Sequence, residues 1–424
     1  MRKRMSVRSL WILPLALGVP AAAATWCVNP AGTGGCMKTI GAAVTAAAAG
    51  DSVEVAAGTY NETVTIGKSL NLFGASPAST IIDATGLGNG INVDGLDNPN
   101  LSAVTISGFT VQNANFEGIV VTNASGVTIM GNTVTGNDKG LAVTAAATTC
   151  PNIAVWETSE GDDCGEGIHL SGVTNSTVLN NMVNANAGGI LLSDDTGATT
   201  QNLVTNNVVT NNALDCGITL ASHVPAASTG ASSAFGVYGN AVTGNQSTQN
   251  GLLGEGAGVG VFASAPGTKA YANLVANNTI TGNGIPGVSI HGHTPGQMLN
   301  GNIILSNTIS GNGADVADSA TPGTAGINIY SVSPVSGTIV AGNTISNETI
   351  AVAWNAPGEV RVQGNVLTSR IGVYNLGSGT VTADNDWWGC TVNPVAPISA
   401  IIGCATPIGA VTVNNWMTQP PASH

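Results

Sequence analysis

Apolar and polar residues alternate along most of this chain, but only over stretches of three to five residues, and two kinds of stretch recur. The first begins with Asn, carries an aliphatic residue at its third position and usually ends in Asn or Ser, as in "NTVTGN" at Asn132. Such short alternation predicts strands with one buried face. Copies begin at Asn132, Asn181, Asn207, Asn240, Asn278, Asn307, Asn343 and Asn365.

The second stretch is Gly, aliphatic, any residue, aliphatic. Copies begin at Gly118, Gly140, Gly167, Gly189, Gly217, Gly258, Gly287 and Gly326, with degenerate copies at Thr349 and Arg370. The shortest spacings between copies are 22, 22, 23 and 21 residues. A fixed period this short predicts a solenoid of three short strands per turn, each turn hydrogen-bonded to the next at about 4.8 Å. We expect the Asn residues to stack in ladders and the glycines to form the corners.

The segment "TIGAAVTAAAAGDSVEVAAGTYNETVTIGKSLNLFG" (39–74) and the tail "DNDWWGC" (384–390) complete a resemblance to the pectate-lyase-like superfamily of secreted β-helix proteins with PbH1-type repeats. The resemblance implies an all-β, single-stranded, right-handed parallel β-helix of about a dozen coils with a short N-terminal capping helix. It implies an N-terminal cap with the first coils at 25–75, the β-helix at 76–385 and a C-terminal cap and tail at 386–424. It does not imply one activity, because this fold serves lyases, hydrolases, esterases, epimerases, adhesins and phage fibres.

Residues 1–24 are typical of a cleaved secretory signal peptide: a basic start, an apolar run from Leu10 to Val19, and small residues ending at Ala24. We therefore expect a secreted, periplasmic or cell-surface protein that is a monomer and has no membrane span. Four of its 10 Lys and Arg residues lie in the signal, so the mature chain carries six against 23 Asp and Glu, a net charge of −17. So acidic a chain is not expected to bind nucleic acid.

Six of the seven cysteines form pairs that are close in sequence, and an exported protein is expected to oxidise such pairs. The predicted disulfides are Cys27–Cys36, Cys150–Cys164 and Cys390–Cys404. Cys216 is left as a buried filler. No two cysteines stand at the CxxC spacing of zinc sites. No motif indicates a cofactor, and calcium is left open.

Extra chain gathers in the middle of the solenoid, where the spacings from Gly189 to Gly217, Gly258, Gly287 and Gly326 are 28, 41, 29 and 39 residues. Loops on both sides of the stacked strands predict a groove. Counted from each Gly, position +4 points outward and brings Phe262, His291 and Tyr330 onto adjacent turns. Position +6 brings Asp195 next to His223, with His293 two turns further on.

These residues predict a glycan site, in which Phe262, Tyr330, Asp195, Glu166 and His169 contact the substrate. His223, His291 and His293 are the candidate acid/base groups because imidazole titrates near pH 7. Asp215 or Glu255, at the entrance of the strands, is the expected acidic partner. Two functions stay open. One is a polysaccharide lyase, epimerase or glycoside hydrolase. The other is a non-catalytic cell-surface or scaffold β-helix that binds a glycan or a protein partner.

Overall fold

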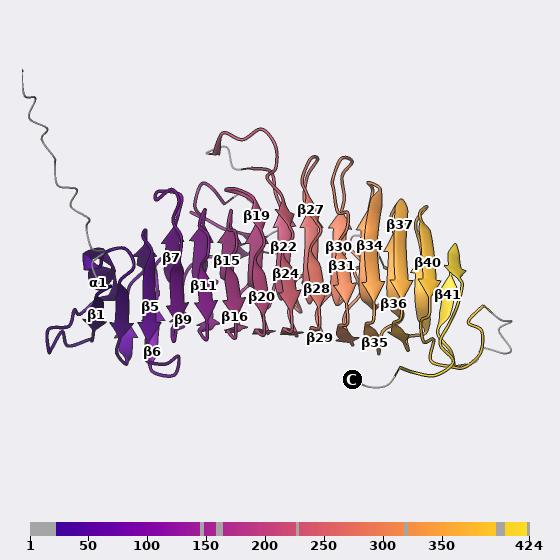
Figure 1. Ribbon diagram of the computed structural model, residues 1–424, viewed down its shortest axis with the longest axis horizontal. Helices are drawn as coiled ribbons and strands as arrows, with labels where there is room; N and C mark the ends of the chain where they lie inside the picture. The colour runs from indigo at the N-terminus through magenta and orange to yellow at the C-terminus, as the bar shows by residue number, and fades with distance from the viewer. Residues whose placement is uncertain are drawn as a thin grey trace, which may run out of the picture.

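The computed structural model describes residues 23–144, 148–157, 164–225, 229–317, 321–395 and 403–421. The predicted signal peptide therefore lies almost wholly outside the described residues. The described chain is a right-handed parallel β-helix whose coils stack along one axis from the N-terminal to the C-terminal end (Figure 1). This confirms the fold class predicted from the repeat. None of the helices in the described ranges is both long and apolar enough to cross a membrane.

Three long parallel sheets run along the axis, and a typical coil gives one strand to each. The 14-stranded sheet contains β1 (Thr25–Val28), β2 (Ser52–Val55), β5 (Leu70–Gly74), β8 (Val104–Ser107), β11 (Thr128–Met130), β16 (Thr177–Leu179), β20 (Leu203–Thr205), β24 (Ala241–Thr243), β28 (Leu274–Ala276), β31 (Ile303–Leu305), β34 (Val335–Ala341), β37 (Gly358–Gln363), β40 (Thr380–Asp384) and β42 (Val411–Val413). The 11-stranded sheet contains β3 (Gly58–Tyr60), β6 (Thr80–Asp83), β9 (Thr110–Gln112), β12 (Thr133–Thr135), β17 (Met182–Asn184), β21 (Val208–Thr210), β25 (Gln246–Thr248), β29 (Thr279–Thr281), β32 (Thr308–Ser310), β35 (Thr344–Ser346) and β38 (Val366–Leu367).

The 12-stranded sheet carries the Gly repeats and positions the candidate site. It contains β4 (Val64–Ile66), β7 (Ile91–Asp94), β10 (Ile119–Thr122), β15 (Glu166–Ser171), β18 (Gly188–Ser193), β22 (Ile218–Ser222), β26 (Val259–Ala263), β30 (Val288–Gly292), β33 (Ala325–Ser331), β36 (Ile350–Asn355), β39 (Ile371–Asn375) and β41 (Thr406–Ile408). Two small sheets add the antiparallel pair β13 (Ala142–Val143) and β14 (Thr148–Thr149), and the parallel set β19 (Thr199–Thr200), β23 (Val237–Tyr238) and β27 (Ala270–Tyr271).

Aliphatic side chains fill the narrow interior in rows, one residue per coil. Ile168 pairs with Ile190, which pairs with Ile218, and this row continues through Val259 and Val288. All five side chains are fully buried. The alternation read from the sequence thus gives the inward face correctly, because side chains in a strand alternate between its two faces.

The asparagines stack as predicted. In the ladder that passes through Asn207, Asn245 and Asn278, each amide oxygen accepts hydrogen bonds from the backbone and side-chain nitrogens of the preceding Asn, at 2.9–3.0 Å. Each amide nitrogen also donates to a backbone carbonyl of an earlier coil, as Asn245 does to Val204. This ladder ends at Asp386, and a second ladder, through Asn250 and Asn283, ends at Glu348. The ladders satisfy buried turn groups that no strand pairs.

The capping helix α1 (Ile40–Ala46) lies at the N-terminal end of the coils. Thr39 is its N-cap and accepts a hydrogen bond from the backbone N–H of Ala42 at 3.3 Å. The carboxylate of Glu62 accepts from the N–H groups of Ile40 and Gly41, both at 2.8 Å. Glu62, which lies in the quoted segment 39–74, therefore supplies the anion that the helix N-terminus favours.

The structure contains the three predicted disulfides, Cys27–Cys36, Cys150–Cys164 and Cys390–Cys404, and Cys216 is free and buried. At the other end of the chain, β41 and β42 extend two of the long sheets beyond residue 385. The C-terminal segment predicted as cap and tail thus contributes strands of its own to the stack.

Three repeat assignments from the sequence are wrong, at Gly140, Thr349 and Arg370. Gly140 does not start a coil, because β10 pairs directly with β15, and the residues after Gly140 form the β13–β14 hairpin instead. The chain between β12 and β15 is therefore one long insertion, which the apparent copy at Gly140 had divided into two repeats. A short Gly-aliphatic alternation can equally form a hairpin, and only pairing distinguishes the two.

The degenerate copies at Thr349 and Arg370 are out of register by two residues. Asn328 pairs with Ala353, and Ala353 pairs with Tyr374, whereas Tyr330 pairs with Asn355. Tyr374 therefore does not continue the row of Tyr330. A two-residue shift keeps every side chain on its predicted face, so the alternation of residues does not reveal it.

Candidate functional site

Insertions cover the outer face of the 12-stranded sheet over its central coils. Every residue of β15, β18, β22 and β30 is buried, although alternate residues point away from the core. In the other two sheets, strands such as β21 bury alternate residues only. The open groove that the sequence predicted is therefore wrong for these coils, because the loops expected to form its walls close over the sheet.

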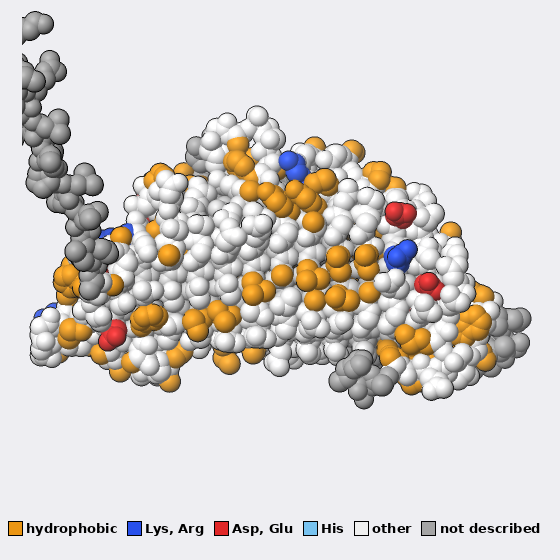
Figure 2. Space-filling model, viewed as in Figure 1, with side chains coloured by type: hydrophobic (Ala, Val, Ile, Leu, Met, Phe, Trp, Pro, Cys, Tyr) orange, Lys and Arg blue, Asp and Glu red, His pale blue; other side chains and the backbone are white. Residues whose placement is uncertain are grey.

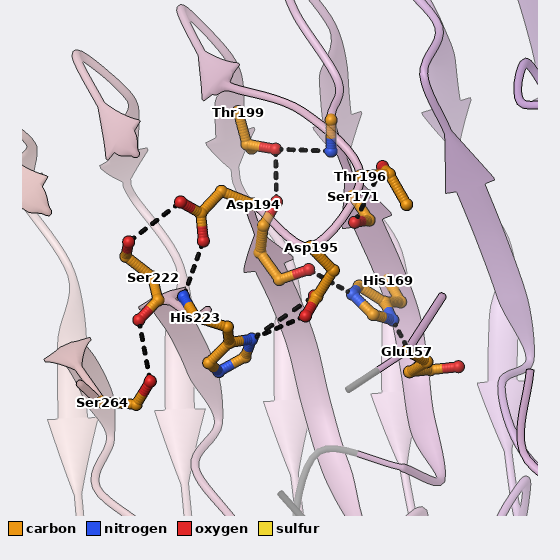
Figure 3. A network of polar contacts seen from close by, with 12 residues as sticks. Glu157, His169, Ser171, Asp194, Asp195, Thr196, Thr199, Ser222, His223 and Ser264 are labelled. Atoms are coloured by element: carbon orange, nitrogen blue, oxygen red, sulfur yellow. Dashed lines mark hydrogen bonds and ion pairs between the residues drawn. The ribbon is translucent and has the colours of Figure 1, made fainter. Parts of the chain in front are cut away.

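A chain of buried polar contacts links three successive coils under this cover (Figure 3). His169 Nε2 lies 2.8 Å from Ser193 Oγ, and His169 Nδ1 lies 3.0 Å from Glu157 Oε1. On the next coil, His223 Nδ1 lies 3.2 Å from Asp195 Oδ1. The sequence register had placed Asp195 beside His223, and the structure brings them together.

The Asp195 carboxylate is the anion at the centre of this chain. Burial opposes its ionisation, but the charge of His223 and hydrogen bonds from His223 and Ser193 outweigh burial, so the pKa of Asp195 lies well below its usual range. The neighbouring Asp194 differs. Burial raises the pKa of Asp194, although it accepts hydrogen bonds from the backbone of His223 and Gly236 and from Ser222. Asp194 fixes the loop after β22, because it holds the backbone on either side of that loop.

Three glutamates gather near His169, at the other end of this series of polar contacts. Glu117 precedes β10, Glu166 begins β15, and Glu157 comes from the long insertion. Glu117 and Glu166 are fully buried, and Glu157 is 7% exposed. The Glu166 carboxylate lies over Gly188, where an added Cβ would collide with it. Ligand atoms of Glu117, Glu157 and His169 all lie within 4.8 Å of one another.

A second cluster surrounds His291. Its Nε2 lies 2.8 Å from the side-chain nitrogen of Asn328 and 3.3 Å from Asp315 Oδ2. The ring of His291 meets the rings of Phe262, His293 and Tyr330 at centroid distances of 5.7, 5.6 and 6.1 Å. His293 and Tyr330 lie 5.0 Å apart. His291 is buried, His293 is exposed, and Phe262 and Tyr330 are partly exposed. The predicted aromatic row thus exists, with an accessible edge and a buried centre.

Three histidines contact carboxylates in the structure, but none of these belongs to Asp215 or Glu255, the acidic partners expected from the sequence. Asp315, Asp195 and Glu157 contact His291, His223 and His169, respectively. Asp215 accepts a hydrogen bond from Thr219 at 3.5 Å, and Glu255 is an exposed turn residue before β26. A role of Asp215 or Glu255 as acidic partner stays a prediction. Asp315 and Glu157 were missed because they lie in insertions, whose paths the repeat does not specify.

Glu117 carried a sequence signal that was overlooked. It stands one residue before Gly118, as Glu166 stands one residue before Gly167, so the two belong to one row of the 12-stranded sheet. The false copy at Gly140 separated them by a coil. With Gly140 removed, the row places Glu117 and Glu166 on adjacent strands, as the hydrogen bond from the Gly118 N–H to the Glu166 carbonyl confirms.

Comparisons with known proteins agree on the fold. Residues 49–250 match the family described as "NosD: Periplasmic copper-binding protein (NosD)". Among curated proteins, no sequence matches this chain significantly. The Dettilon tailspike protein (gp208) is similar in structure, with a TM-score of 0.59 and 14% identity over 85% of this chain and 62% of that one. The catalytic domain of a GH87 α-1,3-glucanase in complex with nigerose has a TM-score of 0.53 and 14% identity over 87% of this chain and 64% of that one.

These likenesses identify the chain as a right-handed parallel β-helix protein similar in part to a family described as periplasmic. This chain spans less than two thirds of the length of the two solved proteins, and at this identity the likeness concerns the fold alone. Among the neighbours are enzymes that act on polysaccharides, as their names state.

The family description names copper, so we tested whether the residues suit it. Cu(I) prefers thiolate and thioether ligands. Six cysteines are in disulfides, and burial raises the pKa of the remaining thiol, Cys216, well above its usual value. The cysteines therefore do not form a Cu(I) site. The set of possible ligands in the described ranges, Glu117, Glu157 and His169, offers oxygen and nitrogen.

Proposed function

We propose that this protein is an exported β-helix that binds a polysaccharide across an aromatic patch formed by Phe262, His293 and Tyr330. The observation that carries the proposal is the geometry of the patch: three rings from adjacent coils meet around His291, and their outer edge is accessible. Aromatic faces favour the apolar faces of sugar rings, and the β-helix presents them at the spacing of its coils.

Charge narrows the class of polymer. The chain holds 10 Lys and Arg residues against 23 Asp and Glu. Figure 2 shows one face on which charged side chains are sparse and uncharged groups prevail. An anionic polymer such as pectate or alginate would meet net repulsion from a chain of this charge. We therefore propose a neutral polysaccharide, and choose an α-1,3-glucan as the first probe because a structurally similar enzyme acts on it.

Binding without cleavage is the form of this proposal that the geometry favours. His291 and Asp315, 3.3 Å apart, have the chemistry of an acid/base pair, and a lyase, epimerase or hydrolase would use such a pair. Both side chains are however buried, His291 at 3% and Asp315 at 2% exposure. A group that transfers a proton to a substrate must reach it, so turnover at His291 requires the loop that carries Asp315 to open.

The test is affinity electrophoresis of the mature protein in gels that contain α-1,3-glucan, alginate or polygalacturonate. We expect retardation by the neutral glucan only, and Tyr330→Ala and His293→Ala to weaken binding about 5- to 100-fold, equivalent to about 1–3 kcal/mol. The control is Tyr271→Ala, which also removes an aromatic ring, but one outside the patch. Tyr271 stacks on Tyr238 at 4.8 Å in the small sheet of β19, β23 and β27. Equal retardation of wild type and Tyr330→Ala in every gel would refute the patch. Release of reducing ends, lost in His291→Gln, would favour the enzyme.

A further inference from the structure

The long insertion between β12 and β15 brings a carboxylate onto two strands of the 12-stranded sheet. Glu157 comes from the insertion, Glu117 from the turn before β10, and His169 from β15. Trp156, next to Glu157, packs its ring 5.9 Å from the ring of His169. The insertion is therefore fixed at this point by ring packing and by the 3.0 Å contact between Glu157 and His169.

Glu117 points into this cluster with no hydrogen-bond donor. It is fully buried, and within the described ranges no group donates a hydrogen bond to either of its carboxylate oxygens. An isolated carboxylate in such a place is costly, so it takes up either a proton or a cation.

The hydrogen bonds around His169 determine which of its two ring nitrogens carries the proton. The other nitrogen then turns a lone pair toward the glutamates. Asp195 is ionised and can only accept, so the Ser193 hydroxyl donates to it. Ser193 Oγ then accepts the N–H of His169 Nε2, 2.8 Å away. When His169 is neutral, as a metal ligand must be, its Nδ1 carries no proton and turns its lone pair toward Glu157 Oε1. Histidines that bind metals are commonly oriented in this way, through the nitrogen that does not touch the metal.

The carboxylates of Glu117 and Glu157 and the Nδ1 atom of His169 thus converge in a buried site, where one cation would lie within reach of all three. We propose that Glu117, Glu157 and His169 form a binding site for one divalent first-row transition ion, with Zn²⁺ or Mn²⁺ as the matching class. Nothing in the proposed glycan binding depends on this site.

The ligand set and its dimensions fit this class. Zn²⁺ binds imidazole nitrogen and carboxylate oxygen at about 2.0–2.2 Å, which puts neighbouring ligand atoms about 3.4 Å apart in a tetrahedron. The three ligand atoms here lie within 4.8 Å of one another. Side-chain rotations that move these atoms by about an ångström therefore bring them to the spacing that Zn²⁺ requires. Two carboxylates and one imidazole suit Zn²⁺ and Mn²⁺, and also Cu²⁺, but not soft Cu⁺. Ca²⁺ prefers six to eight oxygens, more than this set offers.

The experiment uses the whole mature protein, freed of metal by dialysis against a chelator. Zn²⁺ and Mn²⁺ are then titrated separately by calorimetry, with Ca²⁺ as a comparison, and the bound metal is counted after gel filtration. We expect one Zn²⁺ or Mn²⁺ per chain, no comparable binding of Ca²⁺, and a higher melting temperature with Zn²⁺.

Two variants test the assignment without depending on activity. Glu117→Gln keeps the shape of the side chain, so we expect it to fold, to melt at a higher temperature than metal-free wild type, and to lose the response to Zn²⁺. Ser193→Ala keeps all three ligands but frees His169 Nε2, so its affinity should fall about 10- to 100-fold. The matched control is Glu348→Gln, a buried glutamate at the end of an Asn ladder, which should bind Zn²⁺ as wild type does.

Two results would overturn the proposal. The first is a wild-type protein that holds no stoichiometric Zn²⁺ or Mn²⁺ at micromolar concentrations, which would mean that Glu117 and Glu157 share a proton instead. The second is a Glu117→Gln variant that binds Zn²⁺ as tightly as wild type, which would place the ion elsewhere. Neither result bears on the glucan gels, so the two proposals fail separately.

Discussion

His223 Nδ1 lies 3.2 Å from a carboxylate oxygen of Asp195 on the preceding coil, and both side chains are buried, at 5% and 2% exposure. Asp195 thereby contacts the imidazole of one coil and, through Ser193, the imidazole of another. A buried carboxylate with these partners stabilises the fold in a pH-dependent way, and it is the first target for mutation.

Asp195→Asn should lower the free energy of unfolding by about 3 kcal/mol at pH 6, because it leaves His223 buried without its anion. Since the pKa of Asp195 lies below its usual range, the stabilisation in wild type is present above about pH 4 and is lost progressively as the pH falls below it. Urea denaturation at pH 6 and pH 3 measures both. The control is Asp97→Asn, at an exposed turn. A variant as stable as wild type at pH 6 would show that the pair contributes nothing.

Ser289 tests how completely the insertions cover the sheet. Alternation along the strand places Ile290 inward and Ser289 outward, so Ser289→Asp would cost little if the outer face were open to water. In the structure both side chains are fully buried. We therefore expect Ser289→Asp and Ile290→Asp to destabilise alike, by several kcal/mol, because each buries a carboxylate.

The companion variant is Ser289→Ala. In the described part of the chain, no group pairs with the Ser289 hydroxyl, so its removal should leave the melting temperature unchanged or raise it. Thermal melts of the three variants give the answer. If Ser289→Asp melted like wild type while Ile290→Asp did not, the outer face would be open to water.

Asp386 is the last residue of an Asn ladder. Because its carboxyl is buried there, we expect the stability of the fold to decrease as the pH rises. Burial raises its pKa to about 7, against hydrogen bonds from the backbone and side chain of Asn365, both at 2.8 Å. Between about pH 4 and pH 7 the folded state therefore holds a proton that the unfolded chain has released. Stability falls across this window as the pH rises, by up to about 4 kcal/mol for a shift of about three units.

Asp386→Asn removes the titrating group and continues the ladder in the residue type that precedes it. The variant should match wild type near pH 4 and exceed it by about 2–4 kcal/mol at pH 8. Urea denaturation at pH 4 and at pH 8 measures the difference in the free energy of unfolding between the variant and wild type, with Asp97→Asn again as the control. A variant less stable than wild type at pH 8 would mean that the carboxylate is held ionised in the fold.

The repeat, the ladders and the disulfides could be predicted because each depends on residues at fixed spacing. Alternation assigned Ile168, Ile190 and Ile218 to the interior, and the recurring Asn positions assigned the ladders. The local pairing of cysteines was likewise a matter of distance along the chain.

The chain by itself thus determined a stack of short parallel strands, its inward rows and the meeting of Asp195 with His223. Only the tertiary structure decided that a hairpin and not a new coil follows Gly140, that insertions bury the outer face, and that Glu157 reaches Glu117 and His169. The physical reason is that strand pairing between coils repeats with the sequence. The path of an insertion instead depends on its own packing against the sheet, of which the contact between Trp156 and His169 is an example.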